Sequence, residues 1–85
     1  MEISYKPTFV KSFSKLEKDL QQEVLEKIEL FRNKDNHIIL KVHKLHGRFK
    51  ENFSFYVNYK IRIVFMWGDK EEAILLAIGD HDLYK

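Results

Sequence analysis

The sequence predicts an α+β domain in which two helices pack on one face of a small antiparallel sheet. Apolar residues recur at helical spacing between residues 9 and 31, and three stretches between residues 53 and 78 alternate apolar with polar residues. Turn-forming residues separate these stretches. Strands that follow a pair of helices indicate an α+β architecture. A length of 85 residues fits one domain, expected to span residues 1–85.

A short strand is expected first, because residues 2–6 alternate and Pro7 then interrupts the pattern. Thr8 is the predicted N-cap of the helix that follows. The apolar stripe of this helix is Phe9, Phe13, Leu16 and Leu20.

A second helix is expected to begin at residues 19–22, whose residues Asp-Leu-Gln-Gln resemble a capping box. Residues 33–36 close it, and His37 beside its end is expected to interact with the helix dipole. The predicted buried face is Val24, Leu25, Ile28 and Phe31. The two helices therefore form a hairpin with a very short joint.

The remaining chain is expected to form an ordered loop over residues 38–47 and then a three-stranded meander. The first two strands cover residues 53–57 and 61–66, with a turn at residues 58–60. A turn at residues 68–71 leads into the last strand, residues 72–78. Together with the N-terminal strand, these elements complete the predicted fold.

Charge is distributed unevenly along the chain. Residues 1–40 hold seven basic and seven acidic residues, whereas residues 37–67 hold six basic residues and one acid. A phosphate-rich partner favours such a basic segment, although a solvated surface explains it equally simply. The absence of cysteine excludes disulfides and thiolate zinc sites, and no apolar run has the length of a membrane span. We expect a cytoplasmic protein without a membrane partner.

Three motifs resemble the RelE/ParE superfamily of bacterial toxins, and most closely its RelE- and YafQ-type ribonuclease branches. They are VHKLHGR at residues 42–48, NYKIRIVF at residues 58–65 and IGDHDLY at residues 78–84. The resemblance implies the toxin of a type II toxin–antitoxin pair, which cleaves messenger RNA at the ribosomal A site without a metal or cofactor. It also implies a cognate antitoxin as partner, with operator DNA contacted only through that antitoxin.

Histidine and arginine residues are the candidate catalytic groups. The resemblance places His81 at the C-terminal catalytic position and Arg62 at the family's arginine in the third strand. The other candidates are His43 and His46, and the sequence leaves open which of them takes part. Histidine suits proton transfer near neutral pH, and the guanidinium fork of arginine suits a phosphate. A metal site built from these histidines lacks a carboxylate pattern to complete it.

Further residues are expected to hold RNA around these groups. Asp82 would orient an imidazole. The candidate RNA-binding residues are Lys41, Lys44, Arg48, Lys50, Tyr56 and Tyr84. Basic side chains would contact phosphates, and a tyrosine would stack on a splayed base.

Structural roles compete with these assignments. The alternation with Ile61 and Ile63 places Arg62 on the sheet face away from the core, where it could be an exposed arginine paired with Glu72 or another acid. The histidines could be solvated loop residues, and His81 could cap the last strand. At the level of function, the alternatives are a ParE-like inhibitor of DNA gyrase and a degenerate member that only binds an antitoxin. Some YafQ-type toxins have polar active-site groups at the positions of Val57 and Ile61. Because both residues are apolar here, a degenerate member without activity stays a possible alternative.

Overall fold

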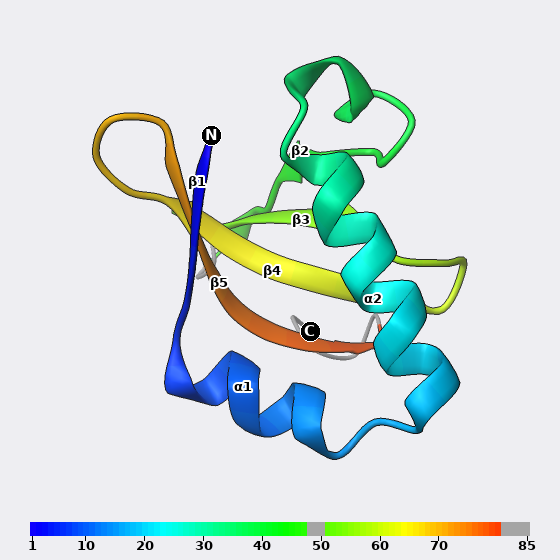
Figure 1. Cartoon of the computed structure of the whole chain (residues 1–85). Helices are drawn as coiled ribbons and strands as arrows, with labels where there is room; N and C mark the ends of the chain where they lie inside the picture. The colour runs from blue at the N-terminus through cyan, green and yellow to red at the C-terminus, as the bar shows by residue number, and fades with distance from the viewer. Residues whose placement is uncertain (48–50, 81–85) are drawn as a thin grey trace.

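The computed structural model describes residues 1–47 and 51–80 (Figure 1). Its elements in chain order are β1 (Glu2–Tyr5), α1 (Pro7–Ser14), α2 (Lys18–Phe31), the 3₁₀ helix η1 (Lys34–Asn36), β2 (His43–Lys44), β3 (Phe53–Tyr56), β4 (Ile61–Trp67) and β5 (Glu72–Asp80). The strands form one sheet in the order β1-β5-β4-β3-β2. The predicted α+β class, the helical hairpin and the meander β3-β4-β5 are confirmed.

The sheet extends beyond the predicted meander at both edges. β1 pairs with β5 in parallel, with Ile3 opposite Ala73. β2 lies inside the segment expected to be a loop and pairs antiparallel with β3, with His43 opposite Ser54. The periodicity of the sequence predicts neither pairing. β2 is only two residues long, and β1 pairs with a strand near the other end of the described chain.

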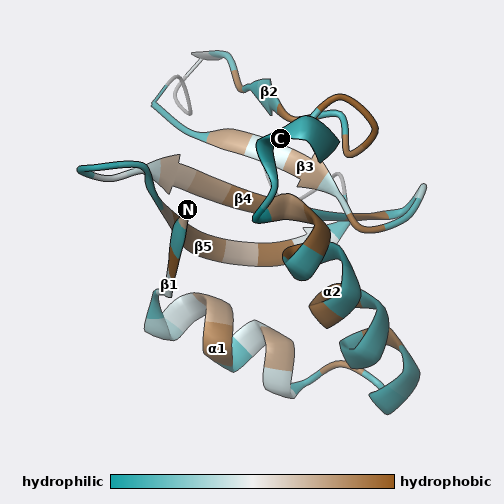
Figure 2. Ribbon diagram, turned by 45° about the horizontal axis from the view of Figure 1, so that its top comes forward, coloured by the Kyte–Doolittle hydropathy of each residue, from teal (hydrophilic) through white to brown (hydrophobic). Residues whose placement is uncertain are grey.

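Both helices pack on the same face of the sheet, and the core lies between the two layers (Figures 1 and 2). Phe31, at the end of α2, is fully buried in the centre of this core. Its ring stacks on Phe55 with centroids 4.2 Å apart and meets Phe65 edge-on at 4.9 Å. The other fully buried large side chains include Ile63, Leu75, Val24 and Val57. Aromatic pairs with these geometries add to the stabilisation from buried area.

The joint between the helices differs from the prediction. α1 ends at Ser14 rather than continuing to Leu20, and Glu17 is the N-cap of α2 without a side-chain cap bond. The expected capping box at residues 19–22 is wrong, because α2 already begins at Lys18, so that Asp19 lies inside the helix and is not its N-cap. The side-chain amide of Gln21 donates to the carbonyl of Phe13, 3.0 Å away, across the joint. Leu25 was also expected to be buried, but it is 47% exposed and lines an open apolar hollow with Phe9 and Phe13 of α1.

Thr8 does not cap α1, as the sequence had suggested. The N-cap is Lys6, and the Thr8 hydroxyl instead donates a hydrogen bond to the carbonyl oxygen of Leu76 at 2.6 Å. Leu76 is the residue that the bulge between β4 and β5 leaves without a register partner. Thr8 therefore gives a hydrogen bond to a strand carbonyl at an irregular point of the ladder.

Replacing Thr8 by valine is expected to lower the free energy of unfolding by about 1 kcal/mol, the usual worth of one such bond. Thr8→Ser keeps the hydroxyl and is the control. Urea denaturation of both variants measures the difference. Equal stability of the valine and serine variants would contradict this role.

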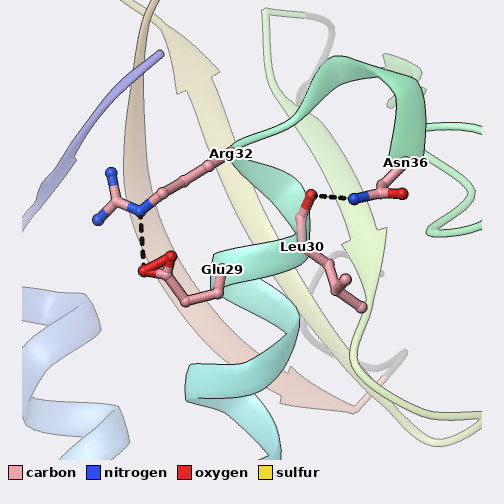
Figure 3. Close-up of polar contacts among 4 residues, drawn as sticks. All are labelled: Glu29, Leu30, Arg32 and Asn36. Carbon is pink, nitrogen blue, oxygen red and sulfur yellow. Dashed lines mark hydrogen bonds and ion pairs between the residues drawn. The ribbon is translucent and has the colours of Figure 1, made fainter.

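Side chains close the C-terminal end of α2 (Figure 3). The Asn36 amide donates to the carbonyl of Leu30 at 2.8 Å, and Arg32 pairs with Glu29 at 3.2 Å on the helix surface. The His37 ring stacks on Phe31, and its Nε2 donates to the carbonyl of Phe31 at 2.9 Å. This contact confirms that His37 interacts with the helix end, where carbonyls lack helical partners.

Within residues 1–47 and 51–80, no helix combines the length and apolar character needed to cross a membrane.

Candidate functional site

The candidate site lies on the sheet face opposite the helices. Arg62 of β4 stands opposite Tyr56 of β3 and Gly79 of β5. His43 of β2 stands opposite Ser54, which is two residues from Tyr56 on the same strand. Directly opposed residues in an antiparallel ladder share a face, and residues two apart on a strand also share one. The register therefore places His43, Ser54, Tyr56 and Arg62 together.

Arg62 is the anchored cation of this face. Only 9% of Arg62 is exposed, and its guanidinium carbon lies 3.5 Å from the centroid of the Tyr56 ring. Its Nη1 donates to the carbonyl of Asn58 at 2.7 Å. The predicted face is confirmed, but the alternative of an exposed arginine is wrong. Among the described residues, Arg62 forms no ion pair with a carboxylate.

The turn between β3 and β4 holds the acceptor of Arg62 in place. The side-chain oxygen of Asn58 accepts from the backbone N–H groups of Lys60 and Ile61, each at 2.8 Å. This is the local pattern that asparagine favours in turns. The Asn58 amide also bonds Glu23 of α2 at 3.0 Å. The sequence had indicated only a turn here, whereas the structure shows that Asn58 fixes the orientation of the guanidinium.

Lys41 and His43 bring a second cation and an imidazole to the same region. The Lys41 ammonium lies 5.5 Å from the centroid of the Tyr56 ring, so Tyr56 contacts two cations. Nδ1 of His43 lies 2.8 Å from the carbonyl oxygen of Lys41. Two positive groups around an aromatic ring can receive a phosphate and a base, because cations bind the phosphate and the ring offers a stacking surface.

The structure separates other candidates from this face. Lys44 stands opposite Phe53 in the register, so it belongs to the helix side of the sheet. His46 is exposed and follows the end of β2. Five of the predicted site residues lie outside the described residues: Arg48, Lys50, His81, Asp82 and Tyr84. Residues 1–47 and 51–80 contain no group of three His, Asp or Glu side chains able to hold a metal ion.

Ser54 is a polar residue of this face that was not among the site residues predicted from the sequence. It is fully buried, and its hydroxyl finds no hydrogen-bond partner within the described part of the chain. A buried hydroxyl without a partner is uncommon and costs stability. The alternation of β3 placed Ser54 on the polar face, and this was the one sequence signal available.

Lys34 and Glu71 form an exposed ion pair at the other end of β4 from Arg62. The hydrogen bond and positive charge of Lys34 lower the pKa of the Glu71 carboxyl below its usual value. This contact joins η1 to the turn before β5 and takes no part in the candidate site.

An α-helical hairpin packed on one face of a sheet with the order β1-β5-β4-β3-β2 is the fold of RelE- and YafQ-type toxins. The DinJ–YafQ toxin–antitoxin complex from E. coli matches with a TM-score of 0.75 at 18% identity, over 99% of this chain and 97% of that chain. The archaeal RelE–RelB complex from Pyrococcus horikoshii matches with a TM-score of 0.73 at 14% identity, over 96% of each chain. A conserved hypothetical protein from Helicobacter pylori matches with a TM-score of 0.71 at 24% identity, also over 96% of each chain.

No family model matches the chain, and no curated protein matches it. The structural matches confirm the RelE-like fold that the motifs implied. Because one fold serves several activities, the function has to be argued from the site.

Proposed function

We propose that this protein is the toxin of a type II toxin–antitoxin pair and that it cleaves messenger RNA. The observation that carries the proposal is the Arg62 guanidinium stacked on Tyr56, with the Lys41 ammonium near the same ring and His43 on the same helix-free sheet face. This arrangement supplies a phosphate-binding cation, a stacking ring and a proton-transfer group within one small area. The structural neighbours named as toxin–antitoxin complexes support the toxin class.

The proposed reaction is an attack by a ribose 2′-hydroxyl on the adjacent phosphorus. A histidine, His43 in this proposal, removes the 2′-proton, and the 2′-oxygen bonds to phosphorus as the bond to the 5′-oxygen breaks. Arg62 stabilises the negative charge on the non-bridging oxygens. The departing 5′-oxygen takes a proton from a second acid, a role we assign to His81. The products are a 2′,3′-cyclic phosphate and a free 5′-hydroxyl, and the residues named here do the chemistry without a metal.

The partners follow from the same proposal. A cognate antitoxin would bind the toxin and block it, and operator DNA would be contacted through that antitoxin. Messenger RNA in the A site of the ribosome would be the substrate, so the protein would act in the cytoplasm. No cofactor is required.

Mapping message ends by primer extension after brief induction tests this function. The native chain is expected to leave discrete cuts in translated regions. His43→Ala is expected to reduce them about 10²-fold or more, as loss of a general base does. His81→Ala and His46→Ala are made beside it, and Lys15→Ala, on the opposite side of the molecule, is the control.

The outcomes separate the candidate functions. If His46→Ala abolishes cutting and His43→Ala does not, the general base is His46 and not His43. Intact messages with continued growth arrest would contradict cleavage and indicate a ParE-like inhibitor of gyrase. Intact messages with normal growth would indicate a degenerate member that only binds an antitoxin.

A further inference from the structure

We propose that Lys41 is a positioning residue, whose left-handed backbone holds His43 in the tautomer with the proton on Nδ1 and the lone pair on Nε2. The assignment of Nε2 as the general base rests on the proposed function. The tautomer itself does not, because it follows from the hydrogen bond.

The backbone of residues 37–42 forms a Schellman turn. The N–H of Val42 donates to the carbonyl of His37 at 3.0 Å, and the N–H of Lys41 donates to the carbonyl of Ile38 at 3.1 Å. Lys41 occupies the left-handed position of this motif, with φ of 56°, where glycine is usual. A lysine costs more conformational energy there than a glycine, so the surrounding hydrogen bonds must hold it in place.

This turn is tied directly to the candidate site. The backbone N–H of Tyr56 donates to the carbonyl of Leu40 at 2.9 Å, which attaches the turn to the end of β3. The next carbonyl, that of Lys41, meets Nδ1 of His43 at 2.8 Å. The left-handed residue thus directs its carbonyl to His43 while its ammonium lies near the Tyr56 ring.

The hydrogen bond determines where the proton sits on neutral His43. A carbonyl oxygen only accepts, so Nδ1 must donate and Nε2 carries the lone pair. Free imidazole prefers the opposite tautomer, so the contact changes the state of the ring. His37 is the internal contrast, because its Nε2 bonds the carbonyl of Phe31 and therefore carries the proton.

Long-range ¹⁵N–¹H correlation spectra of the full chain test the tautomer, recorded about two pH units above the ordinary histidine pKa near 6.5. We expect a protonated-type shift at Nδ1 of His43 and at Nε2 of His37. Lys41→Gly is expected to keep this pattern, because glycine adopts the left-handed conformation freely. Lys41→Val is expected to mix the tautomers of His43 alone, because a β-branched residue resists that conformation.

Cleavage rates of the same two variants test the positioning role. Both lack the ammonium, so their ratio isolates the backbone effect. Lys41→Gly is expected to cleave about tenfold faster than Lys41→Val, the scale of one hydrogen bond.

The outcomes are distinguishable. A native spectrum with the proton of His43 on Nε2 overturns the inference, and so do equal spectra and equal rates for the glycine and valine variants. If Lys41→Val does not fold, the native and glycine spectra still decide the tautomer. A native chain that shows the expected tautomer but cuts no RNA supports the inference and overturns only the proposed function.

Discussion

Arg62→Ala is expected to lower the rate of RNA cleavage by about 10²–10³-fold, the effect of removing one preorganised charge-stabilising donor. The guanidinium is already held before substrate arrives, because it stacks on the Tyr56 ring and donates a hydrogen bond to the Asn58 carbonyl. It therefore needs little reorganisation as charge develops on the phosphate. Single-turnover cleavage of a defined RNA, or primer extension where the ribosome is required, measures the loss.

Arg62→Lys separates charge from geometry. Lysine keeps the positive charge but lacks the planar fork and stacks poorly on a ring, so most of the loss is expected to remain. Lys60→Ala, an exposed cation in the adjacent turn, is the control. Thermal unfolding is recorded for each variant, because Arg62 also bonds the turn. Native cleavage by a folded Arg62→Ala chain would remove Arg62 from the mechanism.

Phe31→Ala is expected to cost about 3–5 kcal/mol in the free energy of unfolding, a large share of the stability of a small domain. Phe31 is fully buried, and its ring contacts Phe55 and Phe65 across the interface between helix and sheet. Removing the ring leaves a cavity where the helix layer meets the sheet. Urea denaturation, monitored by the single tryptophan, measures the change.

Leu25→Ala is the matched control in the same helix. The sequence placed Leu25 on the buried face with Phe31, yet it is 47% exposed in the structure. Its truncation is expected to cost less than about 1.5 kcal/mol, because much of the side chain already contacts water. Similar losses for the two variants would contradict this description of the core.

Local patterns in the sequence were sufficient for the helices, the meander and the sidedness of β4. Alternation is a property of neighbouring residues, so the opposition of Arg62 to Ile61 and Ile63 could be deduced without the fold. Local patterns did not predict the helix joint, where α2 begins before Asp19 and Gln21 bonds the carbonyl of Phe13 across the joint. They also failed at Thr8, whose hydroxyl bonds a strand far along the chain.

The sequence by itself determined the class of fold, the basic middle of the chain and the residue types available for phosphate chemistry. Only the tertiary structure decided that Arg62 is buried against Tyr56, that β2 brings His43 to the same face, and that Lys41 directs its carbonyl to His43. Periodicity reports which side a residue faces within its own element. The register between strands and the left-handed turn at Lys41 depend on contacts between separate segments, and those contacts select which of the basic and histidine residues meet.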